Sequence, residues 1–198
     1  KWPTSYGVTL ETFQGGVNAE PIAGATPTGY YLKKLCHGEI SLAANGRVKT
    51  NFHTYVIFRM GGIYLDYAEA LFRATGGADV KGSYKMTARE AASKTRERVG
   101  IPAFETGMSN EAFWEAYKNE RMVELAFEGH RFWDVRRWKE ADQYFKSVKQ
   151  AKITKNADGT FSYNYPEVAR QWNDKMYLFP IPQSEIMKNK NLEQNPQW

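Results

Sequence analysis

Three glutamates spaced four residues apart are the side chains in this sequence with the clearest capacity for chemistry. Glu120, Glu124 and Glu128 share one stripe if their segment is helical, because residues four apart lie on the same helix face. Glycoside hydrolysis uses two carboxylates about 5 to 10 Å apart, and helical neighbours meet that requirement. A structural role is the competing interpretation, because carboxylates on an apolar helix need cationic partners.

Three arginines follow the glutamates closely in the sequence. They lie beyond Gly129 on a second helical segment that can fold back onto the first. Pairing with guanidinium groups lowers the pKa of a carboxyl group, whereas a general acid needs a raised pKa. We therefore expect no catalytic residue here, but a structural charge network of Glu120, Glu124, Glu128, Arg131, Arg136 and Arg137.

Other chemistries find little support in the sequence. It contains no HExxH, GxSxG or Walker motif, and no GxGxxG followed by a helix. His53 has no partner at metal-ligand spacing, and Cys36 is the single cysteine. The net charge of +5 comes from dispersed basic residues. We expect no cofactor, no metal and no nucleic-acid partner.

The elements that position the glutamates are predicted to be helical. A helix over 110–128 begins at the N-cap oxygens of Ser109 and Asn110 and stops at Gly129. It is apolar nearly all round, which predicts packing on several sides. Helices over 63–73 and from Thr87 to the residue before Gly100 form a tetratricopeptide-like hairpin. The glycines at 61–62 predict a late start or a bend in the first of these helices.

The remaining segments are shorter or irregular. Residues 28–35 are predicted to cross the core in extended form, and 52–58 to form a strand or an extended lead into a helix. Lys152–Thr154 and Thr160–Tyr163 flank Asp158-Gly159 and predict a β-hairpin. Ser184 is a candidate cap for a short helix near the end.

Aromatic side chains occur in the loops as well as in the helices. Trp2, Tyr6 and Phe13 lie in the Gly- and Pro-rich segment 1–27, where a ring either anchors the loop or stacks on a ligand. Anchoring is the favoured interpretation. Tyr163, Tyr165 and Trp172 either form a polar aromatic surface or, as we expect, cover the helical core.

The run from Asn119 to Trp138, NERMVELAFEGHRFWDVRRW, resembles the signature of the SusD/RagB family of outer-membrane glycan-binding lipoproteins. Further similar segments follow the same order along the chain: 28–35, 63–73, 96–102, 177–186 and 191–196. The resemblance implies a mainly α, SusD-like helical fold with a tetratricopeptide-like helix hairpin, long loops and a small β-hairpin. Within it we distinguish a loop segment at 1–27, a helical core at 28–138 and a loop-rich segment at 139–198.

The same resemblance implies a function without catalysis. SusD-like proteins bind oligosaccharides at the cell surface and work with a SusC-like TonB-dependent transporter of the outer membrane. We expect this chain to be the C-terminal part of such a protein, which would need its N-terminal part to fold and would be held at the membrane by a lipid anchor outside this sequence. Trp2 and Tyr6 are the candidate carbohydrate-binding residues. A tetratricopeptide-type peptide-binding adaptor and a glycoside hydrolase are the alternatives.

Overall fold

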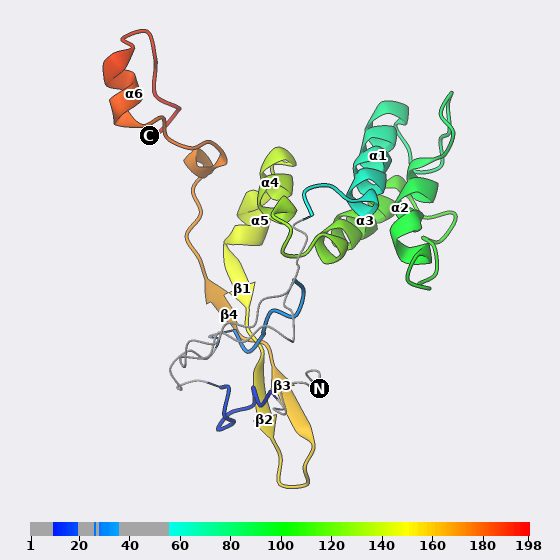
Figure 1. Cartoon of the computed structure of the whole chain (residues 1–198), viewed down its shortest axis with the longest axis vertical. Helices are drawn as coiled ribbons and strands as arrows, with labels where there is room; N and C mark the ends of the chain where they lie inside the picture. Colours follow the sequence, from blue (N-terminus) through cyan, green and yellow to red (C-terminus); the bar gives the residue numbers. More distant parts are fainter. Residues whose placement is uncertain (1–9, 20–25, 27, 36–55) are drawn as a thin grey trace, which may run out of the picture. The chain divides into compact units, whose positions relative to one another are not determined.

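The computed structural model describes residues 10–19, 26, 28–35 and 56–198, which belong to two compact units (Figure 1). One unit contains residues 56–134. The other combines the described residues of 10–35 with Val135–Trp198. Helices dominate the described residues, and two antiparallel strand pairs accompany them. The expected mainly α fold with a small β-hairpin is confirmed.

The first unit is built from α1 (Met60–Thr75), α2 (Ala88–Glu97) and α3 (Asn110–Glu124). Asn110 at the start of α3 bonds to Gly76 after the end of α1, and Glu124 at the end of α3 bonds to Arg59 before α1. These bonds make α1 and α3 antiparallel. The three helices lie side by side in Figure 1, and the close packing of α1 against α2 confirms the predicted helix hairpin.

Small and aromatic side chains fill the core between these helices. Ala88, Ala91 and Ala92 of α2 are fully buried, so the backbones approach closely. Phe113 and Tyr117 of α3 are equally buried, and the Tyr117 hydroxyl donates to the carbonyl oxygen of Leu65 over 2.9 Å. Burial raises the pKa of Tyr117.

Helix ends follow local capping chemistry, with two departures from expectation. Thr87 closes a capping box with Glu90, and the Ser109 hydroxyl accepts from the amide of Ala112. Asn110 does not cap α3: its amide side chain holds the loop after α1 by bonding to Ala78 and Gly76. The first helix begins at Met60, before both glycines, so the predicted late start is wrong.

The signature helix is shorter than the sequence suggests. It ends at Glu124, not beside Gly129, because Phe127 adopts a left-handed conformation with φ 63° inside a turn that leads to α4 (His130–Arg137). Val123 and Phe127 are 62% and 68% exposed. Apolar side chains of the predicted 110–128 segment are therefore left exposed by the described residues. Val99, which follows the end of α2, is also exposed.

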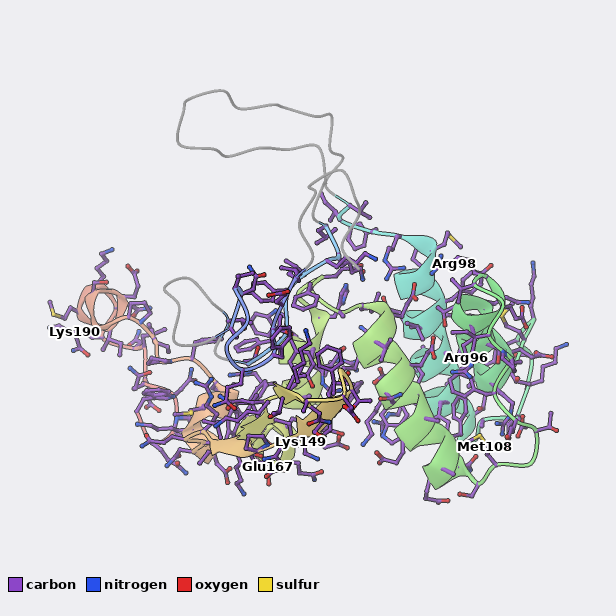
Figure 2. All side chains as sticks on the ribbon, turned by 90° about the horizontal axis from the view of Figure 1, so that it is seen from below. Arg96, Arg98, Met108, Lys149, Glu167 and Lys190 are labelled. Atoms are coloured by element: carbon purple, nitrogen blue, oxygen red, sulfur yellow. The ribbon has the colours of Figure 1, made fainter. Side chains whose placement is uncertain are left out.

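The second unit holds α5 (Ala141–Phe145) and both strand pairs. β2 (Lys152–Lys155) and β3 (Phe161–Asn164) form the predicted hairpin, with Gly159 at φ 82° in its turn. A second pair, β1 (Ser147–Lys149) with β4 (Glu167–Ala169), was not predicted. Lys149 lies opposite Glu167 in this pair, and both side chains are labelled in Figure 2.

The C-terminal segment contains a 3₁₀ turn, η2 (Asp174–Tyr177), and the short helix α6 (Gln183–Lys188). Ser184 lies inside α6, and Pro182 is the N-cap residue. No side chain caps the N-terminus of α6, so the capping role predicted for Ser184 is wrong. The Gln194 amide instead clamps Ile181, accepting from its N–H over 2.8 Å and donating to its carbonyl over 3.0 Å.

Other predicted features have mixed outcomes. Residues 28–35 do not cross a core, because Tyr30, Leu32 and Leu35 are exposed. Residues 56–58 form no strand, while the rest of that predicted element, with His53, lies outside the described residues. Cys36 also lies outside them.

Candidate functional site

The acidic stripe is salt-bridged, and the visible partners, Arg59, Arg96 and Arg98, differ from the predicted ones. Glu120 accepts from Arg96 over 2.9 Å and from the Thr95 hydroxyl over 3.0 Å. Glu124 bonds to Arg59 and Arg98. Arg96 and Arg98 extend from the end of α2 (Figure 2). Each glutamate side chain on the stripe is at most 15% exposed.

Arg59 is the centre of this cluster. Its Nε donates to Glu128 over 2.7 Å and its Nη2 to the other Glu128 oxygen over 2.8 Å, a bidentate pair. Its Nη1 donates to Glu124 over 2.5 Å. Hydrogen bonding to Glu128 raises the pKa of Arg59, so the guanidinium is permanently charged. The cluster joins the start of α1 to the end of α3.

Carboxylates held in this way are unsuited to acid–base catalysis. Glu124 and Glu128 both accept hydrogen bonds from the Arg59 guanidinium and are held in place by it. A glycoside hydrolase needs one carboxyl group that stays protonated near neutral pH. The geometry therefore favours the structural interpretation of the stripe.

The arginines after Gly129 have other visible contacts. Arg136 lies 5.2 Å from the Phe145 ring and 5.4 Å from the Trp172 ring, and its Nε donates to the carbonyl of Met176. Burial lowers the pKa of Arg136. Arg137 lies 4.9 Å from the Trp138 ring. Pairing of Arg131, Arg136 and Arg137 with the acidic stripe stays a prediction. Trp172 helps cover α4 and α5, as expected.

Trp2 and Tyr6, the predicted carbohydrate-binding residues, lie outside the described residues. The third aromatic residue of that segment is visible. Phe13 is half-buried, forms a parallel β-bridge with Ile153, and contacts the Phe161 ring at 5.8 Å. It anchors its loop, as the favoured interpretation predicted.

An aromatic face on the β2–β3 hairpin is the strongest candidate binding site among the described residues. Register places Ile153 opposite Tyr163 and Lys155 opposite Phe161, and alternation puts all four on one face. Phe161 is 43% exposed and Tyr163 is 59% exposed. We call Phe13, Ile153, Lys155, Phe161 and Tyr163 the hairpin face.

The hairpin face lines an open hollow of about 310 Å³. Residues 10–13 of the loop close one side, and Glu11 supplies the carboxylate in the lining. The Lys155 ammonium lies 5.4 Å from the Phe13 ring centroid. Rings, one cation and one carboxylate are thus gathered around a shallow depression, which is suited to a flat, hydroxylated ligand.

Sequence reasoning missed this site for a definable reason. The hairpin was predicted, and Tyr163 was considered for a surface and then assigned to covering the core. The alternation of Phe161, Ser162 and Tyr163 was the available signal, because it places two rings on one side of a strand. Tyr163 and Tyr165 are exposed, so the covering role predicted for them is wrong.

Neither a metal-binding cluster nor a membrane-spanning helix is present among the described residues. No group of three or more His, Cys, Asp or Glu side chains among them is arranged to hold a metal ion. No helix within the described ranges combines the length and apolar character needed to span a membrane.

A helix hairpin packed with a third helix, and an aromatic β-hairpin in the second unit, define a mainly α scaffold. Comparison with known proteins identifies it further. The model of the SusD family matches residues 1–198. The chain belongs to the SusD family.

Individual relatives agree with this assignment. SusD-like protein P2 of Formosa agariphila is 27% identical over 154 residues, which cover 76% of this chain and 26% of that protein. A SusD-like protein from Bacteroides fragilis has a solved structure that is 34% identical, with a TM-score of 0.57 over 72% of this chain and 25% of its own. The structure of BT4246 is 30% identical, with the same TM-score and coverage of 72% and 24%. The chain spans about a quarter of the length of these relatives.

Proposed function

We propose that this chain supplies a glycan-binding surface to a non-catalytic nutrient-uptake protein, and that the hairpin face is that surface. The observation that carries the proposal is the pair of exposed rings, Phe161 and Tyr163, on one face of a strand. Both line a hollow with Glu11 and Lys155. Membership in the SusD family supports a role in glycan binding.

Sugar rings match this arrangement chemically. One face of a pyranose presents C–H groups that pack against an aromatic ring, while its hydroxyls remain free for hydrogen bonds to polar side chains. Phe161 and Tyr163 offer the rings, and the Glu11 carboxylate and Lys155 ammonium offer an acceptor and a donor. The shallow shape suits an extended chain of sugars.

Binding without cleavage is the form of this function that the charges support. The densest carboxylate group in the sequence is the stripe of Glu120, Glu124 and Glu128, which is committed to Arg59, Arg96 and Arg98. No enzyme family is indicated for this chain. A protein that captures and releases sugars needs no carboxyl pair with separated pKa values.

The cellular setting follows from the family and belongs to the same proposal. We infer a surface lipoprotein of the outer membrane that delivers an oligosaccharide to a SusC-like TonB-dependent transporter. The lipid anchor and the N-terminal part of the protein are included in this inference. Trp2 and Tyr6 stay predictions as further stacking residues.

Calorimetric titration of the full-length protein against a panel of oligosaccharides tests the proposal. We expect binding to at least one member, with no cleaved product detected by mass spectrometry. Replacing both Phe161 and Tyr163 with Ala should weaken that binding at least about tenfold, since stacked rings contribute on the order of 1 kcal/mol or more each.

Tyr165→Ala is the matched control. Tyr165 is 54% exposed, nearly as much as Tyr163, but does not line the hollow. Its replacement should leave affinity unchanged. Cleaved product would indicate the hydrolase alternative. Tight binding of a peptide with no affinity for any glycan would indicate the tetratricopeptide-type adaptor, and either result would overturn the proposal.

A further inference from the structure

A second hollow lies beside the hairpin face and differs from it in chemistry. Its volume is about 180 Å³, and its polar lining comes from the loop at 10–19, from the segment near 28 and from the start of β2. We call it the polar pocket, and its polar side chains are Thr12, Gln14, Asn18, Thr26, Gln150 and Lys152.

Hydrogen bonds between three segments hold the walls of this pocket together without a ligand. The Ala151 amide donates to the Thr28 carbonyl over 2.9 Å, and the Gln14 amide donates to the Ile153 carbonyl over 2.7 Å. The Tyr31 hydroxyl donates to the Asn18 carbonyl over 2.9 Å. Three segments are thereby tied together, which reduces the ordering cost that binding would otherwise incur.

Gly29 makes the closest approach in this wall possible. It adopts φ 74°, and a Cβ at this position would collide with the carbonyl oxygen of Ala151. Only glycine accommodates both the positive φ and the close approach of the Ala151 carbonyl. The wall is therefore specified by the sequence.

The charge of the polar pocket is one-sided. Lys152 is the one cation among the described residues of its lining, and none of those residues is Asp or Glu. Neighbouring lysines differ in this respect, because Lys146 and Lys149 lie 3.6 Å and 3.8 Å from the carboxylates of Asp142 and Glu167. Within the described part of the chain Lys152 has no such carboxylate partner. An anion would find amide and hydroxyl donors and one unpaired ammonium here.

The size of the pocket limits what enters it. Pockets for drug-sized ligands measure about 300 to 1,000 Å³. The polar pocket is smaller, at about 180 Å³, and fits a single sugar ring. Thr12 and Ile153 line both this pocket and the hollow at the hairpin face, so the two flank the Phe13–Ile153 bridge.

We propose that the polar pocket binds a terminal sugar ring bearing an anionic group, while the preceding rings lie on the hairpin face. The inference rests on the proposed glycan-binding function and adds a ligand class, the acidic oligosaccharides. Lys152 pairs with the anionic group, and the surrounding amides and hydroxyls bind the ring hydroxyls. Carboxylated and sulfated rings share this chemistry.

The test compares three tetrasaccharide probes by calorimetry with the full-length protein: oligogalacturonate, a sulfated carrageenan fragment and neutral cellotetraose. At least one acidic probe should bind at least about tenfold more tightly than the neutral one, because hydrogen bonds to charged groups contribute about 1.5 to 3 kcal/mol. The probe with the higher affinity distinguishes a carboxylate from a sulfate.

Lys152→Gln should remove most of this preference and leave binding of the neutral probe unchanged. Lys149→Gln, which alters a nearby lysine outside the lining, is the control and should have no effect. Preference for the neutral probe, or an unchanged preference in Lys152→Gln, overturns this inference alone. Absence of binding to all three probes and to the wider panel overturns the proposed function with it.

Discussion

Arg121 and Asp134 form an ion pair in which the side chains are 5% and 4% exposed, with Nε donating to Oδ2 over 2.7 Å. The pair connects α3 to α4 across the turn that interrupts the signature run. Arg121 also donates to Asp66 of α1 over 2.6 Å. Burial alone would lower the pKa of Arg121, but the hydrogen bond with Asp134 and further interactions raise it.

Removal of Asp134 is predicted to destabilise the protein strongly. Among the described residues, Asp134→Ala leaves the buried guanidinium with only the exposed Asp66 as a carboxylate partner, and breaking a buried pair costs on the order of 3 kcal/mol or more. Urea denaturation of the full-length protein measures the loss. Glu97→Ala, which removes an exposed pair with Lys94, should change stability little. Equal stability of the two variants would contradict the prediction.

Two adjacent glycines are predicted to respond oppositely to alanine. A Cβ at Gly61 would lie 2.5 Å from Nη1 of Arg59 and 2.8 Å from Oε1 of Glu124, so Gly61→Ala should displace that ion pair and destabilise the protein. At Gly62 the nearest atom is a Leu125 methyl group at 3.9 Å. Gly62→Ala should therefore raise stability by up to about 1 kcal/mol through helix propensity. Thermal unfolding of both variants decides, and a rise in both would show that the ion pair adapts.

Acid sensitivity is predicted to depend partly on Asp79. Its hydrogen bond from Arg89 lowers its pKa in the folded protein below the ordinary value of 3.8. A depressed carboxyl pKa contributes stability above the unfolded-state value, and this contribution is lost as pH falls through the folded-state value. Asp79→Asn should thus be less stable than the parent at pH 7 and approach it below pH 3.8. A stability difference that stays constant across this range would be inconsistent with the assignment.

The C-terminal clamp is predicted to control local opening. Gln194→Ala removes both hydrogen bonds to Ile181 and should speed amide hydrogen exchange at Ile181 and in α6. Exchange in α1 and α3 should stay unchanged. Gln183→Ala, at an exposed position in the same helix, is the control. Unaltered exchange at Ile181 would show that the prolines alone hold this segment.

Local signals in the sequence predicted the elements, and long-range contacts accounted for most departures. The helix start at Thr87 and the turn at Asp158-Gly159 depend on neighbouring residues, so pattern alone predicted both. Glu128 was expected to be salt-bridged, but its partner Arg59 precedes a different helix. No spacing rule connects two such positions.

The aromatic face shows the same limit from the opposite direction. Alternation on β3 predicts that Phe161 and Tyr163 share a side, but not which side is covered. The covering of each side depends on Phe13, a residue about 140 positions earlier in the sequence that bridges to Ile153 and contacts the Phe161 ring. Trp2 and Tyr6 were predicted as stacking residues because both are aromatic and lie in a Gly- and Pro-rich segment. Phe161 lies in a regular strand, where an aromatic residue is usually assigned to packing.

The bridge between Phe13 and Ile153 also determines when the hairpin face can exist during synthesis. The loop leaves the ribosome before the helices of the first unit, and the hairpin follows only after all three have been made. Closing so long a stretch of chain carries a large entropic cost, and contacts of this kind form late in folding. Nascent chains should therefore acquire the helix hairpin before the proposed binding surface, and early termination would leave the helices without that surface.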